Sequence, residues 1–200
     1  LALAGEEVVI GSRNAARAQE AADRLMAKAP SARIHGDENQ AAAQEGDVAF
    51  LTVPFAAQEP LLQQVGPYLR GKVVVVTVVP LEYVGGRPRV LEVAEGSAAM
   101  QAQHLLPQSR VVAAFHSVSA VDLLVPHRAI EGDVVVCADD REAKEQVMRL
   151  AERIQQLRAI DGGDLQNARY VEGLTALLLH INRIYKGRSM IKVVGIGPAP

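Results

Sequence analysis

The sequence has one cysteine, no tryptophan and few aromatic residues, and these shortages exclude several classes of protein. Cys137 alone cannot form an intramolecular disulfide or a cysteine-based zinc cluster, and we interpret it as a small buried strand residue. Aromatic residues make up only 4% of the chain. Valine, alanine and leucine must therefore fill the core, as they do in parallel strands covered by helices.

Strong charge and long apolar runs are lacking too. The formal net charge of -2 provides no basic field for nucleic acid and no polybasic patch for a membrane surface. No apolar run reaches about 18 residues, the length that a helix needs to span a bilayer. No signal peptide is visible. We expect a cytoplasmic protein with neither nucleic acid nor membrane as a partner.

The sequence does contain enough apolar residues, 49% of 200, for one domain of ordinary size or one domain with a small appendage. Short β-branched runs alternate with helical segments, which predicts a Rossmann-type α/β fold with a doubly wound, mostly parallel sheet. The nearly all-valine run 73–79 is typical of a strand buried on both faces. Helical content rises after Asp140, so we expect a Rossmann domain over residues 1–140 and a helical cap or dimerisation part over 141–200.

The same patterns give approximate bounds for each element. We expect strands over 7–10, 32–35, 48–53, 73–79, 110–115 and 133–138, with another ending at 160–163. We expect helices over 14–29, 37–45, 56–69, 97–106, 119–124, 140–158 and 165–185. The segment 81–93, which contains two adjacent glycines, is expected to be an irregular loop.

The start of the sequence resembles the end of a helix, because Leu1–Gly5 is an apolar turn closed by glycine. A Rossmann unit places its first strand and Gly-rich phosphate loop before such a helix. The sequence contains no such loop, since Gly195-Ile196-Gly197 has no helix behind it. We therefore expect the first strand and the Gly-rich loop to be missing from this sequence and to lie about 20 residues upstream of Leu1.

The turn Gly11-Ser12-Arg13 follows the strand that should meet the adenosine ribose of a dinucleotide. A carboxylate at this point selects NAD, whereas small polar and basic side chains suit the 2′-phosphate of NADP. Arg17 lies one helical turn beyond Arg13, and no acidic residue occurs between Gly11 and Gln19. The sequence predicts an NADP site here; the alternative is a solvated turn with surface arginines.

Five segments in order resemble the NADPH-dependent reductases of coenzyme F420, an 8-hydroxy-5-deazaflavin. They are VVIGSR (8–13), FLTVPF (50–55), VVVTVVP (74–80), VVAAFHSVSA (111–120) and DGGDLQNARYVEGLTALLLHIN (161–182). The resemblance covers nearly the whole chain and extends to the closing YKGRSMIKVVGI. It implies an oxidoreductase that passes a hydride between NADP(H) and coenzyme F420, with no catalytic side chain and no metal.

The resemblance also implies roles for individual residues. Ser12, Arg13 and Arg17 would hold the 2′-phosphate, and Phe55, Val79 and Ala120 would line the NADP site. His116 and Val118 would contact the deazaflavin, with His116 forming a hydrogen bond to its polar edge. The plain alternative for Phe55 and Val79 is core packing, and for His116 a structural role.

The sequence departs from the family at several positions near the second substrate. Ser117 and Ser119 stand where the family often has threonine and proline, and Ser189 and Met190 also differ. Other functions therefore stay open: an NADPH-dependent reductase of a flavin or a metal chelate, or a non-enzymatic dinucleotide-binding domain. An imine-type reductase would need an acid, for which the candidates are Asp161, Asp164 and Glu172; their alternative role is helix capping or solvation.

The helix expected from Leu165 is more apolar than a surface helix with one buried stripe. Its apolar positions are Leu174, Leu177, Leu178, Leu179 and Ile181. They indicate either a core helix or a dimer face. The resemblance favours a homodimer.

Overall fold

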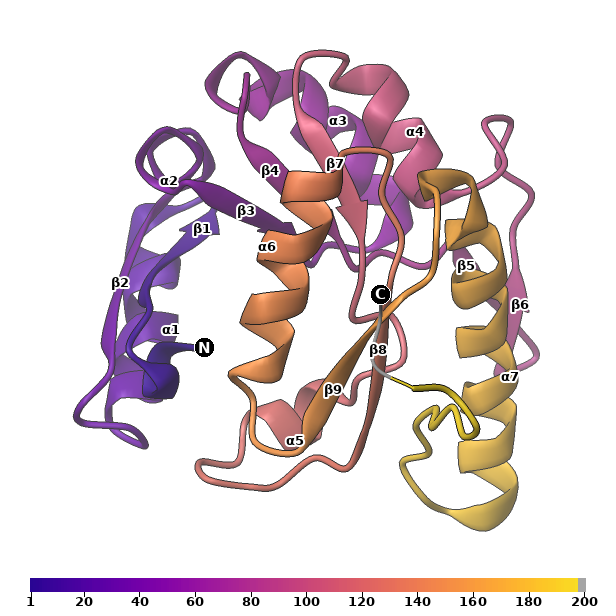
Figure 1. The fold of residues 1–200 in the computed structure, drawn as a ribbon. Helices are drawn as coiled ribbons and strands as arrows, with labels where there is room; N and C mark the ends of the chain where they lie inside the picture. Colours follow the sequence, from indigo (N-terminus) through magenta and orange to yellow (C-terminus); the bar gives the residue numbers. More distant parts are fainter. Residues whose placement is uncertain (198–200) are drawn as a thin grey trace.

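A computed structural model describes residues 1–197 as an α/β fold with helices on both sides of short strands (Figure 1). The strands are β1 (Glu7–Ser12), β2 (Arg33–Glu38), β3 (Val48–Leu51), β4 (Val73–Val76), β5 (Leu81–Val84), β6 (Arg87–Val90), β7 (Arg110–Ala113), β8 (Gly132–Val136) and β9 (Leu157–Asp161). The helices are α1 (Ala15–Met26), α2 (Asn39–Glu45), α3 (Phe55–Val65), α4 (Ala98–Leu105), α5 (Ala120–Leu123), α6 (Arg141–Glu152) and α7 (Ala168–Tyr185), with 3-10 turns η1 (Ala2–Ala4), η2 (Gly66–Tyr68) and η3 (Leu165–Asn167).

The centre of the fold is the parallel sheet β3-β4-β7, in which the all-valine β4 is the middle strand. Val74 and Val76 pack with side chains of α3 and α4, whereas Val73 and Val75 pack with side chains of α6. All four are fully buried, which confirms the prediction of a strand covered on both faces. An antiparallel bridge between Ala113 and Cys137 links β7 to β8, which pairs in parallel with β9.

A second parallel pair, β1 and β2, lies with α1 at one side of the molecule (Figure 1). Gly36 of β2 allows α1 to come very close, because a Cβ there would lie 2.1 Å from the Ala18 carbonyl carbon. Within residues 1–197, no strand pairs with the second edge of β1 or with the outer edge of β3. The upstream strand and Gly-rich loop expected from the sequence stay a prediction.

Local signals placed most helix starts correctly. Asn14, Ser97, Ser119 and Asp140 each accept a backbone N–H three residues on, as N-cap residues do. Gly5 has a φ of 93° and closes the 3-10 turn η1, as expected of a glycine cap.

Several expected bounds were wrong. β2 continues to Glu38, although a helix was expected from residue 37, and β4 ends at Val76 instead of 79. Gly11 and Ser12 continue β1, so the turn itself begins at Arg13. α6 ends at Glu152 and not near 158, and Leu157, which continues the apolar spacing of Val147, Leu150 and Ile154, is buried in β9 instead. The spacing of apolar residues alone could not predict where α6 ends, because a buried leucine fits a strand as well as a helix.

The segment 81–93, expected to be a loop, contains the antiparallel hairpin β5–β6. Gly85 and Gly86, with φ of 56° and 72°, form its two-residue turn. Two adjacent residues with positive φ match the twist of a hairpin, and glycine adopts that conformation at little cost. The hairpin packs on α7, where His180 Nε2 lies 2.9 Å from the carbonyl oxygen of Pro88.

The C-terminal quarter does not stand apart from the strands. α6 packs in the same core as β4, β7 and β8, and β9 extends the sheet beyond β8. The division at residue 140 stays a prediction. Among residues 1–197, no helix combines the length and apolarity needed to cross a bilayer.

Candidate functional site

The turn from β1 to α1 presents polar and basic groups at a helix N-terminus. The Asn14 Oδ1 accepts the Arg17 N–H at 3.1 Å, and the Ser12 Oγ lies 3.4 Å from the Asn14 nitrogen that donates to it. The first turn of α1 contains no acidic residue. Arg13 and Arg17 are exposed, and neither forms an ion pair within residues 1–197. This turn has backbone and guanidinium N–H donors of the kind that bind a phosphate.

The structure adds two carboxylates that the local sequence did not place here. In the register of β1 and β2, Glu38 is the partner of Ser12, and Asp37 is the partner of Gly11. The Asp37 Oδ1 accepts the backbone N–H of Glu38 at 2.7 Å, whereas Glu38 is exposed. The segment between Gly11 and Gln19 contains no acid, but the neighbouring strand β2 places two carboxylates beside it.

Three further candidate residues follow the three central strands. Phe55 begins α3 after β3, Val79 follows β4, and His116 follows β7. The carboxyl ends of neighbouring parallel strands meet at one edge of a sheet, which is where α/β proteins bind ligands. Phe55 and Val79 are half-buried, and Phe55 packs against the core on the α3 side. This partial burial is compatible with core packing and also with contact to a cofactor.

His116 is the most unusual side chain of this edge. Phe115, with a φ of 65°, turns the chain after β7 and directs His116 inward, where it is only 7% exposed. Neither ring nitrogen has a hydrogen-bond partner within residues 1–197. Burial lowers the pKa of His116 to about 4, so the ring is neutral at pH 7.

A buried polar group without a partner costs about 1–3 kcal/mol, and native structures contain few of them. The neutral imidazole carries one donor and one acceptor. His116 therefore has one donor and one acceptor available for a polar group at this edge.

The remaining two candidates lie on the same loop as His116. Val118 is half-buried among the side chains on the α6 side of the sheet, and its N–H donates to the Phe115 carbonyl at 3.1 Å. Ala120 is exposed as the first residue of α5, which Ser119 caps. His116, Val118 and Ala120 are therefore close because they lie within five consecutive residues of one loop.

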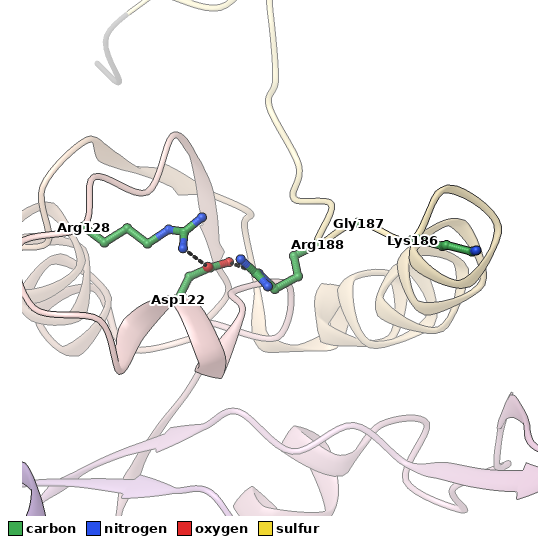
Figure 2. Close-up of a pocket in the computed structure, with 5 residues that line it drawn as sticks. All are labelled: Asp122, Arg128, Lys186, Gly187 and Arg188. Atoms are coloured by element: carbon green, nitrogen blue, oxygen red, sulfur yellow. Dashed lines mark hydrogen bonds and ion pairs between the residues drawn. The ribbon is translucent and has the colours of Figure 1, made fainter.

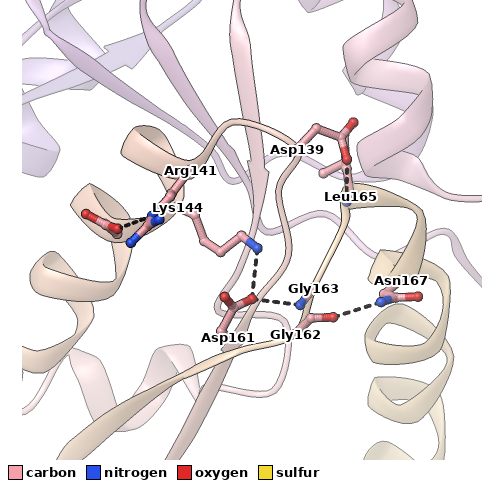
Figure 3. A network of polar contacts seen from close by, with 9 residues as sticks. Asp139, Arg141, Lys144, Asp161, Gly162, Gly163, Leu165 and Asn167 are labelled. Atoms are coloured by element: carbon pink, nitrogen blue, oxygen red, sulfur yellow. Dashed lines mark hydrogen bonds and ion pairs between the residues drawn. The ribbon is translucent and has the colours of Figure 1, made fainter. Parts of the chain in front are cut away.

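The acids considered for an imine-type reaction have structural contacts. The Asp161 Oδ1 accepts from the Lys144 Nζ and from the Gly163 N–H, each at 2.8 Å (Figure 3). Glu172 is buried and accepts the backbone N–H groups of Ala98 and Ala99, at 2.9 and 3.1 Å, at the start of α4.

Burial raises the pKa of Glu172 to about 7, against the opposite effect of the two N–H groups. Asp164 is the N-cap residue of η3, without a side-chain capping bond. These contacts agree with the capping interpretation of Glu172, and Asp161 holds the Gly162–Gly163 turn in place.

Comparison with known proteins gives these residues a context. Residues 1–80 match the family model described as NADP oxidoreductase, coenzyme F420-dependent. The F420-dependent NADP reductase of Methanothermobacter marburgensis is 40% identical over 188 residues, which are 91% of this chain and 84% of the relative. The enzyme of the same name from Methanocaldococcus jannaschii is 38% identical over 188 residues, again 91% of this chain and 84% of the relative.

Solved structures share the fold at lower identity. A protein from Arthrobacter sp. FB24, provisionally named as an F420-dependent NADP reductase, has a TM-score of 0.81 at 24% identity, covering 98% of this chain and 93% of its own. The hypothetical protein SMa0349 from Sinorhizobium meliloti has a TM-score of 0.67 at 22% identity, covering 84% of this chain and 78% of its own.

Proposed function

The chain belongs to the family of F420-dependent NADP reductases, and we propose that it transfers a hydride between NADP(H) and the deazaflavin coenzyme F420. The observation that carries the proposal is the identity of 38–40% with three reductases of that activity over about nine-tenths of this chain. His116 also supports it, because its buried ring has no hydrogen-bond partner within residues 1–197 and would offer a polar contact to a second ligand.

When bound, the two coenzymes supply the chemistry, which is direct hydride transfer between nicotinamide C4 and deazaflavin C5. We propose that Ser12, Arg13 and Arg17 bind the 2′-phosphate, with the guanidinium groups donating to its oxygens. Phe55 and Val79 would line the NADP site at the ends of β3 and β4 and exclude water from it.

His116 would hold the polar edge of the deazaflavin while remaining neutral. Val118 and Ala120, on the same loop, would pack against the rings where they meet. The protein then contributes alignment and exclusion of water, which suit a reaction without a protein acid or base.

The test is an absorbance assay with NADPH and oxidised F420, with flavin mononucleotide and a ferric chelate as alternative acceptors. The chain is tested both by itself and with the upstream segment of a family member joined before Leu1. Reduction of F420 well above that of the other acceptors is expected. Preference for flavin or chelate, or tight NADPH binding with no transfer to any acceptor, would replace the proposal with one of the other functions.

We further propose that the protein forms a homodimer through α7. Tyr170, Leu177 and Ile184 recur every seven residues and are 70%, 55% and 72% exposed, so they form an apolar stripe along one face of the helix. Light scattering after size exclusion should give twice the 21.4 kDa chain mass. Leu177→Glu should give the monomer, whereas Leu3→Glu, at an exposed leucine of η1, should not. A monomeric parent protein would defeat the proposal.

The cytoplasmic location expected from the sequence stays a prediction.

A further inference from the structure

A polar cavity of about 250 Å³ lies between the loop after α5 and the segment that follows α7. Its lining residues are Asp122, Arg128, Lys186, Gly187 and Arg188 (Figure 2). A second cavity of about 210 Å³ shares Asp122, Arg128 and Arg188 and continues along the chain to Lys192. The two form one basic groove, which nothing in the reaction described above uses.

Asp122 organises the groove. Figure 2 shows its carboxylate between two guanidinium groups that reach it from different segments of the chain. The Arg188 Nε donates to the Asp122 Oδ2 at 2.9 Å, and an Arg128 terminal nitrogen lies 3.1 Å from the Asp122 Oδ1. Asp122 is 8% exposed, so the two arginines are fixed at a buried point.

The groove carries more positive charge than its own carboxylate can balance. Two arginines face one Asp122, which leaves an excess of one positive charge, whereas the Lys186 side chain points away from them (Figure 2). Lys192 does not add to the excess, because it pairs with Glu131.

The arginines also keep unused donors. Each guanidinium has five N–H groups, and the contacts with Asp122 occupy only part of them. Both side chains are nearly half exposed, Arg128 at 44% and Arg188 at 46%, so the remaining donors reach the solvent side. Planar donors of this kind match the oxygens of a phosphate or a carboxylate.

The groove adjoins the loop assigned to the second substrate. Asp122 follows His116 by six residues, and a chain of six residues spans at most about 20 Å. α5 carries both Ala120 and Asp122. A substrate whose ring lies at His116 can therefore extend a side chain of ordinary length into the groove.

We propose that this groove binds an anionic group, a phosphate or a carboxylate, on the side chain of the substrate whose ring lies at His116. The inference rests on the proposed function and deepens it. Coenzyme F420 carries a phosphodiester and glutamate carboxylates beyond its ribityl chain, which are groups of this class. The groove then selects the complete coenzyme over its neutral chromophore, and Asp122 is the positioning residue that fixes the two arginines.

The experiment compares two substrates in the NADPH assay: F420 and the same deazaflavin chromophore without its phosphate and glutamates. The parent protein should have a KM at least about tenfold lower for F420, the effect of one charge-assisted hydrogen bond. In Arg128→Gln and in the double variant with Arg188→Gln, the ratio of the two KM values should fall toward one. Lys28→Gln removes an exposed charge elsewhere and should keep the ratio of the parent protein.

Inorganic phosphate tests whether the groove binds an anion that is not attached to the substrate. It should compete with F420 and not with the neutral chromophore. A ratio near one in the parent protein, a ratio unchanged in the double variant, or a variant that raises only the KM for NADPH would overturn the proposal.

Calorimetric titration of both deazaflavins keeps the two proposals separable. Tighter binding of F420 without hydride transfer would defeat the proposed function and support the groove. Hydride transfer to both deazaflavins, with equal affinity for the two, would support the proposed function and defeat the proposal for the groove.

Discussion

Replacing His116 by leucine should make the protein more stable and a poorer enzyme. Leucine has a similar volume and fills the buried site without two polar atoms that lack partners. An unpartnered buried polar group costs about 1–3 kcal/mol, so the free energy of unfolding should rise by about 1 kcal/mol or more. The lost hydrogen bond to the deazaflavin should raise its KM about tenfold, with a much smaller change in the KM for NADPH.

The dependence of protein stability on acidic pH should also depend on His116. The unfolded chain binds a proton at this histidine below its ordinary pKa of 6.5, whereas folded His116 resists protonation down to about 4. Stability that is complete above pH 6.5 is therefore lost as the pH falls toward 4, by up to about 3 kcal/mol. His116→Leu should lack this loss.

Urea denaturation at several pH values, without substrate, measures both effects alongside the two KM values. Ser109→Ala is the matched control, because the Ser109 Oγ is buried and does have a partner, the Leu69 carbonyl at 2.8 Å. That variant should lose about 1 kcal/mol of stability at every pH. If His116→Leu is destabilised as Ser109→Ala is, or keeps the KM of the parent protein for F420, the reasoning about the unpartnered ring is refuted.

Three further predictions follow from other parts of the fold. Exchange of Arg13 or Arg17 for serine should raise the KM for NADPH about tenfold and leave NADH kinetics unchanged; equal effects on both coenzymes would contradict the 2′-phosphate assignment. The contribution of Glu172 to the free energy of unfolding should fall as the pH rises from about 4.5 through 7, because this carboxyl loses its proton at a lower pH in the unfolded chain than in the folded one. Glu172→Gln should remove that slope in urea melts, and an unaltered slope would exclude this carboxyl as its source. Gly36→Ala should cost about 3 kcal/mol in the same melts, since its Cβ would overlap the backbone of α1, whereas Gly46→Ala, with 3.5 Å of room, should cost far less; equal costs would argue against the close approach.

Features that depend on a few neighbouring residues could be predicted from the sequence. The caps at Asn14 and Ser97 follow from side chains that reach a backbone N–H only three residues away. The buried β4 follows from an unbroken run of valines, which leaves no polar face for solvent. The identity of the family likewise came from short segments in a fixed order.

Errors arose where one local pattern fits two structures. Leu157 continues the apolar spacing of α6 and yet belongs to β9, because pairing with β8 decides its conformation. The segment 81–93 contains the Gly-Gly signal of a hairpin turn, but its strands are too short and polar to predict without α7 beside them.

The sequence by itself determined the fold class, the covered valine strand and the two basic residues after β1. Only the tertiary structure decided that His116 is buried with no partner among residues 1–197, that Glu38 lies beside Ser12, and that Arg128 and Arg188 converge on Asp122. The reason is physical. Helix caps and strand burial depend on interactions within a few residues, whereas a side chain's partners and its exposure depend on segments that packing brings together, such as Asp122 and Arg188, which are 66 residues apart.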